Sequence, residues 1–487
     1  MAESPLDARG RAEVDGIVID APGLEGNVSV ERPAAAGGHG SRWRTELDDA
    51  LARLDMVTER EVVIADPRHV GAEGGRTHGG ARAGANSPRL TLTVPGPGQG
   101  REQAVLSIDE HGVATWHFKG GRSGGRSVRG GTRTRTYAIE RETVAPRGSG
   151  QSRGLIPGHD KVLLVVTFPV AKATGYDARF DVREWDSDWH PARVRSISAT
   201  GRLTQLGAED WDRLSTGPSL MFVHGTFDTT EHCFGRLARN TRKELDQRYA
   251  GRVIAYDHPT IAVDPIENAR KFLELAGDRA LQFDIVCHSR GGLVSRAIAE
   301  RPGDLADIAP AVRVRTIIFV GVPNQGTILA EPDHWNELLD RATTLVNLSP
   351  GPGVSDALAT VVALVRSIAA DRARKLDGLD AMAPHGDFLK RLNVASRGEA
   401  DYRAVVSDFD PKNPGLLEWL DDEVRDGMFG HRPNDMMVTI DSMTGENGSS
   451  RFPIKEIRGF IKSDAVEHAQ YFPQKLTTDA LLEWLPG

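Results

Sequence analysis

Residues Phe283–Ala297 read F-D-I-V-C-H-S-R-G-G-L-V-S-R-A, and this stretch carries more structural information than any other in the chain. Its apolar part, Phe283–Val286, predicts a buried strand, and the pattern from Gly291 predicts a helix that follows at once. The turn between them is centred on Ser289 and has the layout of a nucleophile elbow, G-x-S-x-G. Gly291 supplies the small residue needed after the serine, whereas Cys287 departs from the pattern before it. The start of the helix favours negative charge that develops at this serine.

The bulk composition is that of a globular chain with more than one domain. Its 487 residues are 39% hydrophobic and 26% charged, and a chain of this length accommodates two or more domains. The formal net charge of −8 argues against general nucleic-acid binding. The N-terminal residues form no apolar signal segment, and no apolar run approaches the roughly 20 residues that span a bilayer. With two cysteines and no Cys/His cluster at metal-ligand spacing, we expect a cytoplasmic protein without a disulfide framework or a metal.

Changes of pattern along the chain divide it into three parts. Residues 1–40, rich in glycine, alanine and charge, are expected to be a flexible tail. Residues 41–205 show short alternating strands with Gly-rich turns, which indicate a smaller β-rich accessory domain of the sandwich type. Residues 206–487 alternate strands with helices, the signature of a parallel sheet wrapped by helices. Within that part, a helical insertion at 328–392 lies where a cap or lid would cover the serine.

Two low-complexity stretches, Gly71–Pro88 and Lys119–Gly154, interrupt the predicted β-rich domain. The second carries a run of arginines among glycines. Because aromatic stacking partners are absent within that run, we interpret it as a solvated loop rather than a phosphate- or RNA-binding arm. Residues Ala178–Trp185 are expected to form a further strand near the end of the domain.

A nucleophilic serine needs a general base and an acid that orients the base. In sheets of this type the chain order is serine, then acid, then histidine. Four histidines follow Ser289, and we prefer His468 because it lies between the last predicted strand and the closing helix, at the edge where ligand sites form. His334 and His385 lie in the helical insertion, and His431 comes just before the best acid candidate.

The preferred acid is Asp435, in P-N-D-M-M-V, which follows the strand Tyr402–Val406 by an excursion and precedes His468. Asp408 and Asp410, directly at the end of that strand, remain alternatives. A carboxylate at either place could accept a hydrogen bond from Nδ1 of the histidine.

The oxyanion that forms during acyl transfer requires two backbone N–H donors. We expect one from Arg290, the residue after the nucleophile, and one from Thr226, in the H-G-T-F loop that follows the strand Ser219–Val223. Gly225 allows close approach of this loop to the serine, and His224 is expected to pack beneath the loop and hold it.

Five motifs occur in the same order as in a known superfamily. H-G-T-F, C-H-S-R-G-G-L-V, G-V-P-N-Q-G-T, N-D-M-M-V and A-V-E-H-A-Q-Y-F together resemble the α/β-hydrolases. Within them, the pattern over residues 217–487 is similar to bacterial lipases and esterases and to GPI inositol-deacylase-like hydrolases. The resemblance implies an α/β-hydrolase parallel sheet and a triad of Ser289, Asp435 and His468 that needs no cofactor. Asn324 stands where this branch usually has histidine, which affects the pocket rather than the triad.

Together these observations predict a serine hydrolase that cleaves a carboxylic ester, acyl or lipid-like, through an acyl-enzyme. The apolar stretch Leu358–Ile368 fits either a lid over an acyl pocket, with peripheral membrane contact, or a plain buried helix. A peptidase or thioesterase would use the same triad, and a non-catalytic binding or scaffold protein on a hydrolase fold is the alternative from another class. The expected partner is a small-molecule or lipid ester and not nucleic acid, and the β-rich domain is the place for a protein partner.

Overall fold

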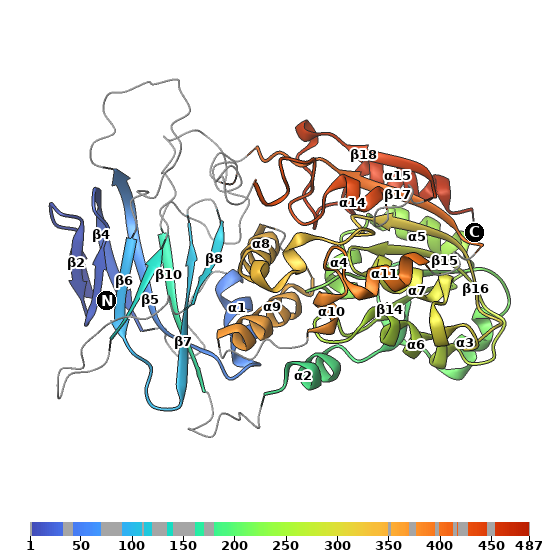
Figure 1. The fold of residues 1–487 in the computed structure, drawn as a ribbon, viewed down its shortest axis with the longest axis horizontal. Helices are drawn as coiled ribbons and strands as arrows, with labels where there is room; N and C mark the ends of the chain where they lie inside the picture. The colour runs from blue at the N-terminus through green and yellow to red at the C-terminus, as the bar shows by residue number, and fades with distance from the viewer. Residues whose placement is uncertain are drawn as a thin grey trace.

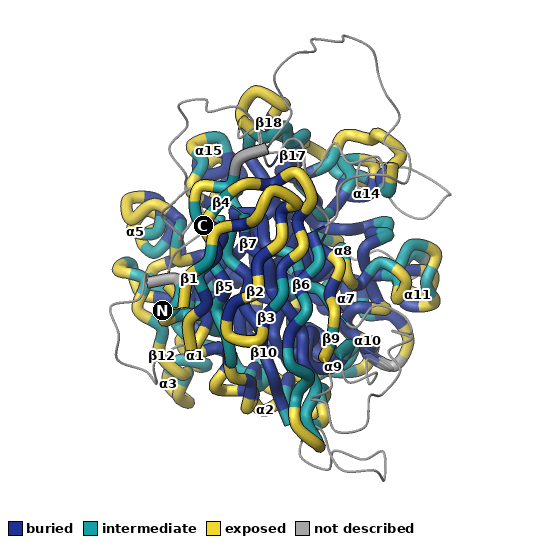
Figure 2. The backbone as a smooth tube through the Cα atoms, turned by 90° about the vertical axis from the view of Figure 1, so that its left-hand side faces the viewer, coloured by how far each residue is buried: buried dark blue, intermediate teal, exposed yellow. Residues whose placement is uncertain are grey.

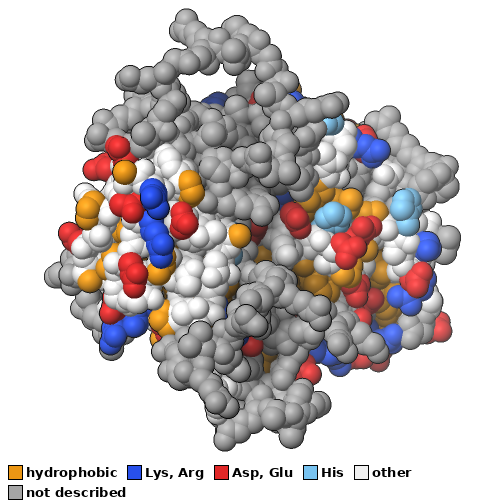
Figure 3. Space-filling model, turned by 60° about the vertical axis from the view of Figure 1, so that its left-hand side comes forward, with side chains coloured by type: hydrophobic (Ala, Val, Ile, Leu, Met, Phe, Trp, Pro, Cys, Tyr) orange, Lys and Arg blue, Asp and Glu red, His pale blue; other side chains and the backbone are white. Residues whose placement is uncertain are grey.

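The structure is a computed structural model in which a β-sandwich and a helix-covered sheet lie at opposite ends, with a helical layer between them (Figure 1). It describes residues 2–32, 42–69, 90–109, 112–118, 134–139, 161–169, 180–348, 352–369, 376–394, 399–412, 416, 427–445 and 453–486. None of the helices in these ranges is long and apolar enough to cross a bilayer. The face shown in Figure 3 carries charges of both signs interspersed with hydrophobic side chains.

Two antiparallel sheets form the N-terminal sandwich. The larger has the strand order β1-β4-β5-β10-β7-β8 and the smaller β2-β3-β6-β9. Their inner faces share one apolar cluster, to which Ile19, Leu92 and Tyr137 contribute from the smaller sheet and Val62 and Val165 from the larger. Figure 2 looks onto this end, where buried positions alternate with more exposed ones along strands such as β3 and β6, as expected for one buried face.

The strands of the sandwich have the following bounds: β1 (Ala2–Pro5), β2 (Arg11–Val14), β3 (Ile17–Asp20), β4 (Leu24–Glu31), β5 (Val57–His69), β6 (Leu90–Pro95), β7 (Arg101–Ile108), β8 (Ala114–His117), β9 (Thr134–Ile139) and β10 (Lys161–Pro169). Residues 2–31, expected to belong to a flexible tail, thus form β1–β4 instead. Asp15 and Gly16 turn β2 back onto β3 with φ of 48° and 75°, the backbone of a tight hairpin turn. The tail was predicted from the average composition of residues 1–40, and such an average does not detect strands of only four to eight residues.

Two further expectations about the N-terminal half change. Residues 71–88 and most of 119–154 lie outside the described residues, but Arg135 lies in β9, where its Nη1 is 2.7 Å from Oε2 of Glu102. The strand expected at Ala178–Trp185 is wrong, because helix α2 (Val182–Trp189) begins there. Asp181 caps this helix by accepting from the N–H groups of the second and third residues that follow it.

The C-terminal sheet has eight strands in the order β12-β11-β14-β13-β15-β16-β17-β18. The six strands from β14 onwards in that order pair in parallel, whereas β11 and β12 form an antiparallel hairpin at one edge. The sheet is therefore mixed rather than parallel throughout, and it begins at Arg193, before the expected boundary at residue 206. The strands are β11 (Arg193–Ile197), β12 (Leu203–Gln205), β13 (Ser219–Val223), β14 (Val253–Asp257), β15 (Gln282–His288), β16 (Arg313–Val320), β17 (Asp401–Ser407) and β18 (Ile454–Phe460).

Helices cover both faces of this sheet because successive residues of each buried strand point to opposite sides. Helices α6 and α7 pack on the face that receives Met221 and Val223, and α5 and α15 pack on the face that receives Leu220 and Phe222. The helices of this half, apart from the cap, are α3 (Ala208–Leu214), α4 (Thr230–Phe234), α5 (Arg239–Arg248), α6 (Pro265–Ala276), α7 (Gly291–Glu300), α14 (Ile440–Thr444) and α15 (Lys475–Trp484), with 3-10 turns at Gly303–Leu305 and Lys462–Asp464.

The insertion at 328–392 is helical. It contains 3-10 turns at Ile328–Ala330 and Pro332–His334 and the helices α8 (Trp335–Leu348), α9 (Val354–Ala369), α10 (Asp377–Asp380) and α11 (Asp387–Val394). Residues 357–365 of α9 are buried, and α9 packs against α8 and against α1 (Arg42–Ala52). Of the two interpretations of Leu358–Ile368, the buried helix is therefore the one found.

The sandwich joins this helical layer through the edge strand β8. The N–H groups of Ala114 and Trp116 donate to Oγ1 of Thr344 at 3.0 Å and to Oδ1 of Asp340 at 2.8 Å. The Thr344 hydroxyl donates back to the carbonyl of Ala114 at 3.2 Å. Side chains of α8 thus take the place of a neighbouring strand along this edge.

Candidate active site

The elbow joins β15 to α7 through one strained residue. Ser289 has a φ of 51°, a backbone region that non-glycine residues rarely adopt. Its N–H donates to the carbonyl of Val320 at 3.0 Å, which ties the turn to the end of β16. A Cβ on Gly291 would lie 2.4 Å from the carbonyl oxygens of Val223 and His224. No side chain fits at that position, as the elbow motif requires.

Cys287, the departure from the elbow motif, is accommodated inside the sheet. It is fully buried, and its Sγ lies 3.4 Å from the carbonyl oxygen of Ile318. Burial raises the pKa of the Cys287 thiol, so the side chain is neutral and packs as a small apolar group.

Asp435 and His468 are hydrogen-bonded to each other. Nδ1 of His468 lies 2.6 Å from Oδ2 of Asp435, whose side chain is fully buried. Oδ1 of Asp435 accepts from the N–H groups of Met437 and Val438 at 3.1 and 2.9 Å, and Oδ2 also accepts from the hydroxyl of Tyr471 at 2.8 Å. Four donors therefore satisfy the carboxylate and fix its orientation. Nδ1 of His468 is accordingly the protonated nitrogen, which leaves a lone pair on Nε2.

Ser289 and His468 both border the carboxyl ends of β15 and β16. A Cβ on Gly321 would lie 3.1 Å from Oδ2 of Asp435 and 3.2 Å from Cε1 of His468, and the carbonyl just before Gly321 is the one bonded by the serine N–H. His288, next to Ser289, donates from Nε2 to the carbonyl of His468 at 2.9 Å. The structure thus joins Asp435 and His468 directly and places both beside Gly321, next to the carbonyl that the Ser289 N–H binds.

The H-G-T-F loop passes directly over the serine. A Cβ on Gly225 would lie 2.7 Å from Cβ of Ser289, so only glycine allows this approach. His224 is fully buried beneath the loop, where burial lowers its pKa, and its Nδ1 lies 3.1 Å from the carbonyl of Gly225. Thr226 lies between the serine and the cap, with its hydroxyl 3.7 Å from Sδ of Met382.

The Arg290 side chain has a role that the sequence did not suggest. It is fully buried, its Nε donates to the carbonyl of Gly378 at 2.9 Å, and its other nitrogens donate to the carbonyls of Pro259 and Val263. Burial lowers the pKa of Arg290 to about 10, which still leaves the guanidinium charged at neutral pH. Arg290 therefore ties the elbow to α10 of the cap and to the loop after β14.

The alternative residues lie elsewhere. Nδ1 of His468 is taken by Asp435, and Asp408 and Asp410 are partly exposed. The other late histidines are also at least partly exposed: His334, His385 and His431. Tyr471, which sequence reasoning missed, comes three residues after the histidine in H-A-Q-Y, and that short spacing was its only signal.

Comparison with known proteins places this site within a family. A family described as a domain of unknown function, DUF7379, matches residues 190–486. The chain belongs to this family. The match takes in β11 and the whole eight-stranded sheet, so the DUF7379 domain contains every residue of the candidate site. Among curated proteins, none matches the chain.

Solved structures similar to this DUF7379 protein include bacterial lipases and a phospholipase. Bacillus licheniformis lipase BlEst2 in its mature form is 17% identical, covers 55% of this chain and 91% of its own, and has a TM-score of 0.31. Staphylococcus hyicus lipase is 14% identical, with 55% and 95% covered and a TM-score of 0.35. Phospholipase PlaB from Legionella pneumophila is 14% identical, with 49% and 52% covered and a TM-score of 0.34.

Proposed function

We propose that this DUF7379 protein is a serine hydrolase that cleaves carboxylic esters. The observation that carries the proposal is the 2.6 Å hydrogen bond between His468 and the buried Asp435, at the sheet edge where the strained Ser289 lies. Serine, acid and histidine follow one another along the chain in the order that α/β-hydrolases use.

In the proposed reaction, Oγ of Ser289 attacks the ester carbonyl while Nε2 of His468 takes its proton. Asp435 holds the imidazole and stabilises the imidazolium. The N–H groups of Thr226 and Arg290 donate to the oxyanion. His468 then gives its proton to the leaving alcohol, and a water activated by the same histidine releases the acyl group from the serine.

Apolar surroundings support an acyl or lipid-like substrate. Phe227, Leu293 and Met382 belong to a buried apolar cluster that adjoins the elbow and the H-G-T-F loop. Ser289 and His468 are only 8% and 6% exposed. The preference for an apolar acyl group thus rests on the lining of the site and not on α9, which is buried.

A fluorophosphonate probe tests the proposal, because it reacts covalently with an activated serine. The folded protein should form one adduct, Ser289→Ala should form none, and Ser295→Ala should keep it. Ser295 is a matched control, since it lies in α7 and donates to the carbonyl of Gly291 at 2.7 Å. A folded protein without an adduct, as expected of a binding or scaffold protein, contradicts the proposal.

The substrate class is tested with matched esters, thioesters and amides of graded acyl length. We expect turnover of esters to exceed that of the amides and to rise with acyl length. A preference for amides or thioesters would make the protein a peptidase or a thioesterase that uses the same residues.

A further inference from the structure

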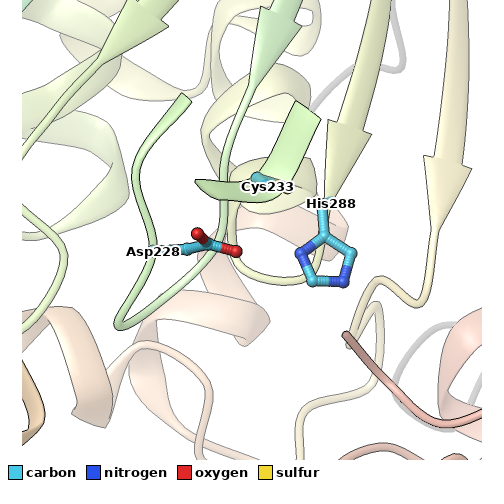
Figure 4. A group of neighbouring side chains, drawn as sticks. All are labelled: Asp228, Cys233 and His288. Atoms are coloured by element: carbon cyan, nitrogen blue, oxygen red, sulfur yellow. The ribbon is translucent and has the colours of Figure 1, made fainter. Parts of the chain in front are cut away.

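A second cluster of reactive side chains lies behind the serine and takes no part in the reaction above. It consists of Asp228 in the loop after β13, Cys233 in α4 and His288 at the end of β15. One ligand atom from each of them lies within 4.8 Å of the others, and all three residues are buried. In Figure 4 the carboxylate and the imidazole face each other across a gap, and Cys233 enters from the helix between them. Asp228 and Cys233 are five residues apart, whereas His288 comes from a distant strand, so the complete set is visible only in the folded chain.

His288 presents an unused lone pair to this cluster. Its Nε2 lies 2.9 Å from the carbonyl oxygen of His468, and a carbonyl only accepts, so Nε2 carries the proton and Nδ1 carries the lone pair. Nδ1 is buried and has no hydrogen-bond partner among the described residues. A buried polar atom without a partner costs free energy unless something satisfies it. Metal-binding histidines usually have this arrangement, with the second ring nitrogen donating to a carbonyl or carboxylate.

Asp228 is held as an oriented carboxylate. Its Oδ1 accepts from Nδ1 of His232 and from the N–H of Thr229, both at 2.8 Å. Nε2 of His232 lies 2.9 Å from Nη2 of Arg236, which can only donate, so Nδ1 of His232 is the donor to Asp228. Carboxylates bound in this way on their outer side are typical of metal ligands.

Cys233 completes a donor set that a divalent cation would neutralise. Its side chain is buried beside the Asp228 carboxylate and the His288 imidazole. A thiolate, a carboxylate and a neutral imidazole together carry two negative charges, which balance one divalent cation inside the fold. Soft sulfur with imidazole and carboxylate is the set that zinc prefers.

We propose that Asp228, Cys233 and His288 bind one zinc ion through a carboxylate oxygen, Sγ and Nδ1. Ligands of tetrahedral zinc, at about 2.0–2.3 Å from the metal, lie roughly 3.3–3.8 Å from one another, so the atoms close in by about 1 Å on binding. Zinc forms a bond to Sγ as the S–H bond breaks, and that proton leaves to solvent. The ion joins three segments that surround the serine: the loop that carries Thr226, α4 and the elbow strand.

The test uses the full chain, stripped of metal with a chelator and titrated with Zn²⁺ alone and with Co²⁺ alone. We expect one equivalent of Zn²⁺ by elemental analysis, release of one proton from the thiol, and a sulfur-to-cobalt charge-transfer band. The chain has two cysteines, both free and buried, so Cys287→Ser is a matched control. The band should persist in Cys287→Ser and vanish in Cys233→Ser. Zinc affinity of Cys233→Ser should fall by more than the roughly 10–100-fold that loss of an outer partner costs.

The outcomes separate this proposal from a metal-free thiol–carboxylate hydrogen bond. A folded wild-type chain that binds no stoichiometric zinc, or a cobalt band that survives Cys233→Ser, overturns the proposal. Near-ultraviolet circular dichroism checks that each variant is folded. If Cys233→Ser does not fold, the band in Cys287→Ser still decides, because Cys233 is then the only cysteine left in the chain. None of these readouts depends on ester cleavage.

Discussion

Replacing Asp435 by asparagine probes the proposed acid with little change in shape. Oδ1 of Asp435 accepts from two backbone N–H groups, so the asparagine oxygen takes that place and its amide nitrogen takes the place of Oδ2. That nitrogen can donate but not accept. His468 then loses the acceptor that keeps the proton on Nδ1, and its proton moves to Nε2. A protonated Nε2 cannot take the proton of Ser289.

The expected loss follows from this change of tautomer. In a serine protease the same substitution lowers kcat by about 10⁴, which corresponds to a barrier higher by roughly 5.5 kcal/mol. The hydroxyl of Tyr471, 2.8 Å from Oδ2, has to turn round and accept instead. One mismatched buried contact costs about 1–3 kcal/mol, so the variant should fold but unfold at lower temperature.

The assay measures kcat for an activated ester together with the ¹⁵N chemical shifts of the His468 ring, which report the tautomer. Asp408→Asn is the control, because Asp408 is partly exposed at the end of β17 and Nδ1 of His468 is bonded to Asp435. The reasoning is refuted if Asp435→Asn keeps more than about a tenth of the activity, or if Asp408→Asn loses as much.

Three further changes have expected outcomes. Tyr471→Phe removes one of the four donors to Asp435. It should lower the free energy of unfolding by about 1 kcal/mol, measured by chemical denaturation, and should lower kcat for an ester only a few-fold. Arg290→Lys loses the contacts to Gly378 and its neighbours and should lower kcat and the melting temperature together; an unchanged melting temperature would contradict the tie to the cap. Burial lowers the pKa of His190 to about 3, so folding keeps it neutral, and its stabilising contribution is complete above about pH 6.5 and is lost as the pH falls toward 3. Between pH 7.5 and 5 this amounts to about 2 kcal/mol, and His190→Gln should flatten that part of the urea-midpoint profile.

Local sequence was sufficient to predict the part of the candidate site that lies within one short motif, the elbow. The elbow could be found because Ser289 lies between an apolar strand and a helix, within a few residues. Asp435 and His468 could be placed by their order along the chain, which parallel sheets convert into proximity at one edge. Their mutual hydrogen bond could only be seen in the folded chain.

The features that the sequence did not predict are of two kinds: very short elements, and contacts between distant segments. Strands β1–β3 have four residues each, too few for a reliable alternation signal. The Asp181 cap of α2 overrides the β-type residues that favoured a strand. The contact of Tyr471 with Asp435 joins two distant loops. The Asp228–Cys233–His288 cluster forms only when the end of β15 lies beside the loop after β13 and α4.

The covered edge of β8 has a consequence for the molecule as a whole. An uncovered strand edge can pair with a strand from another chain, which leads to aggregation or strand exchange. Here Asp340 and Thr344 of α8 engage that edge, and Leu51 and Leu54 of the N-terminal half share an apolar core with the cap. Separating the chain near residue 205 would expose the edge of β8 on the N-terminal fragment. It would also expose the apolar surface of the shared core on both fragments. The sandwich and the eight-stranded sheet therefore share buried surface through the helical layer, and we expect neither half to fold unchanged when it is moved to another protein.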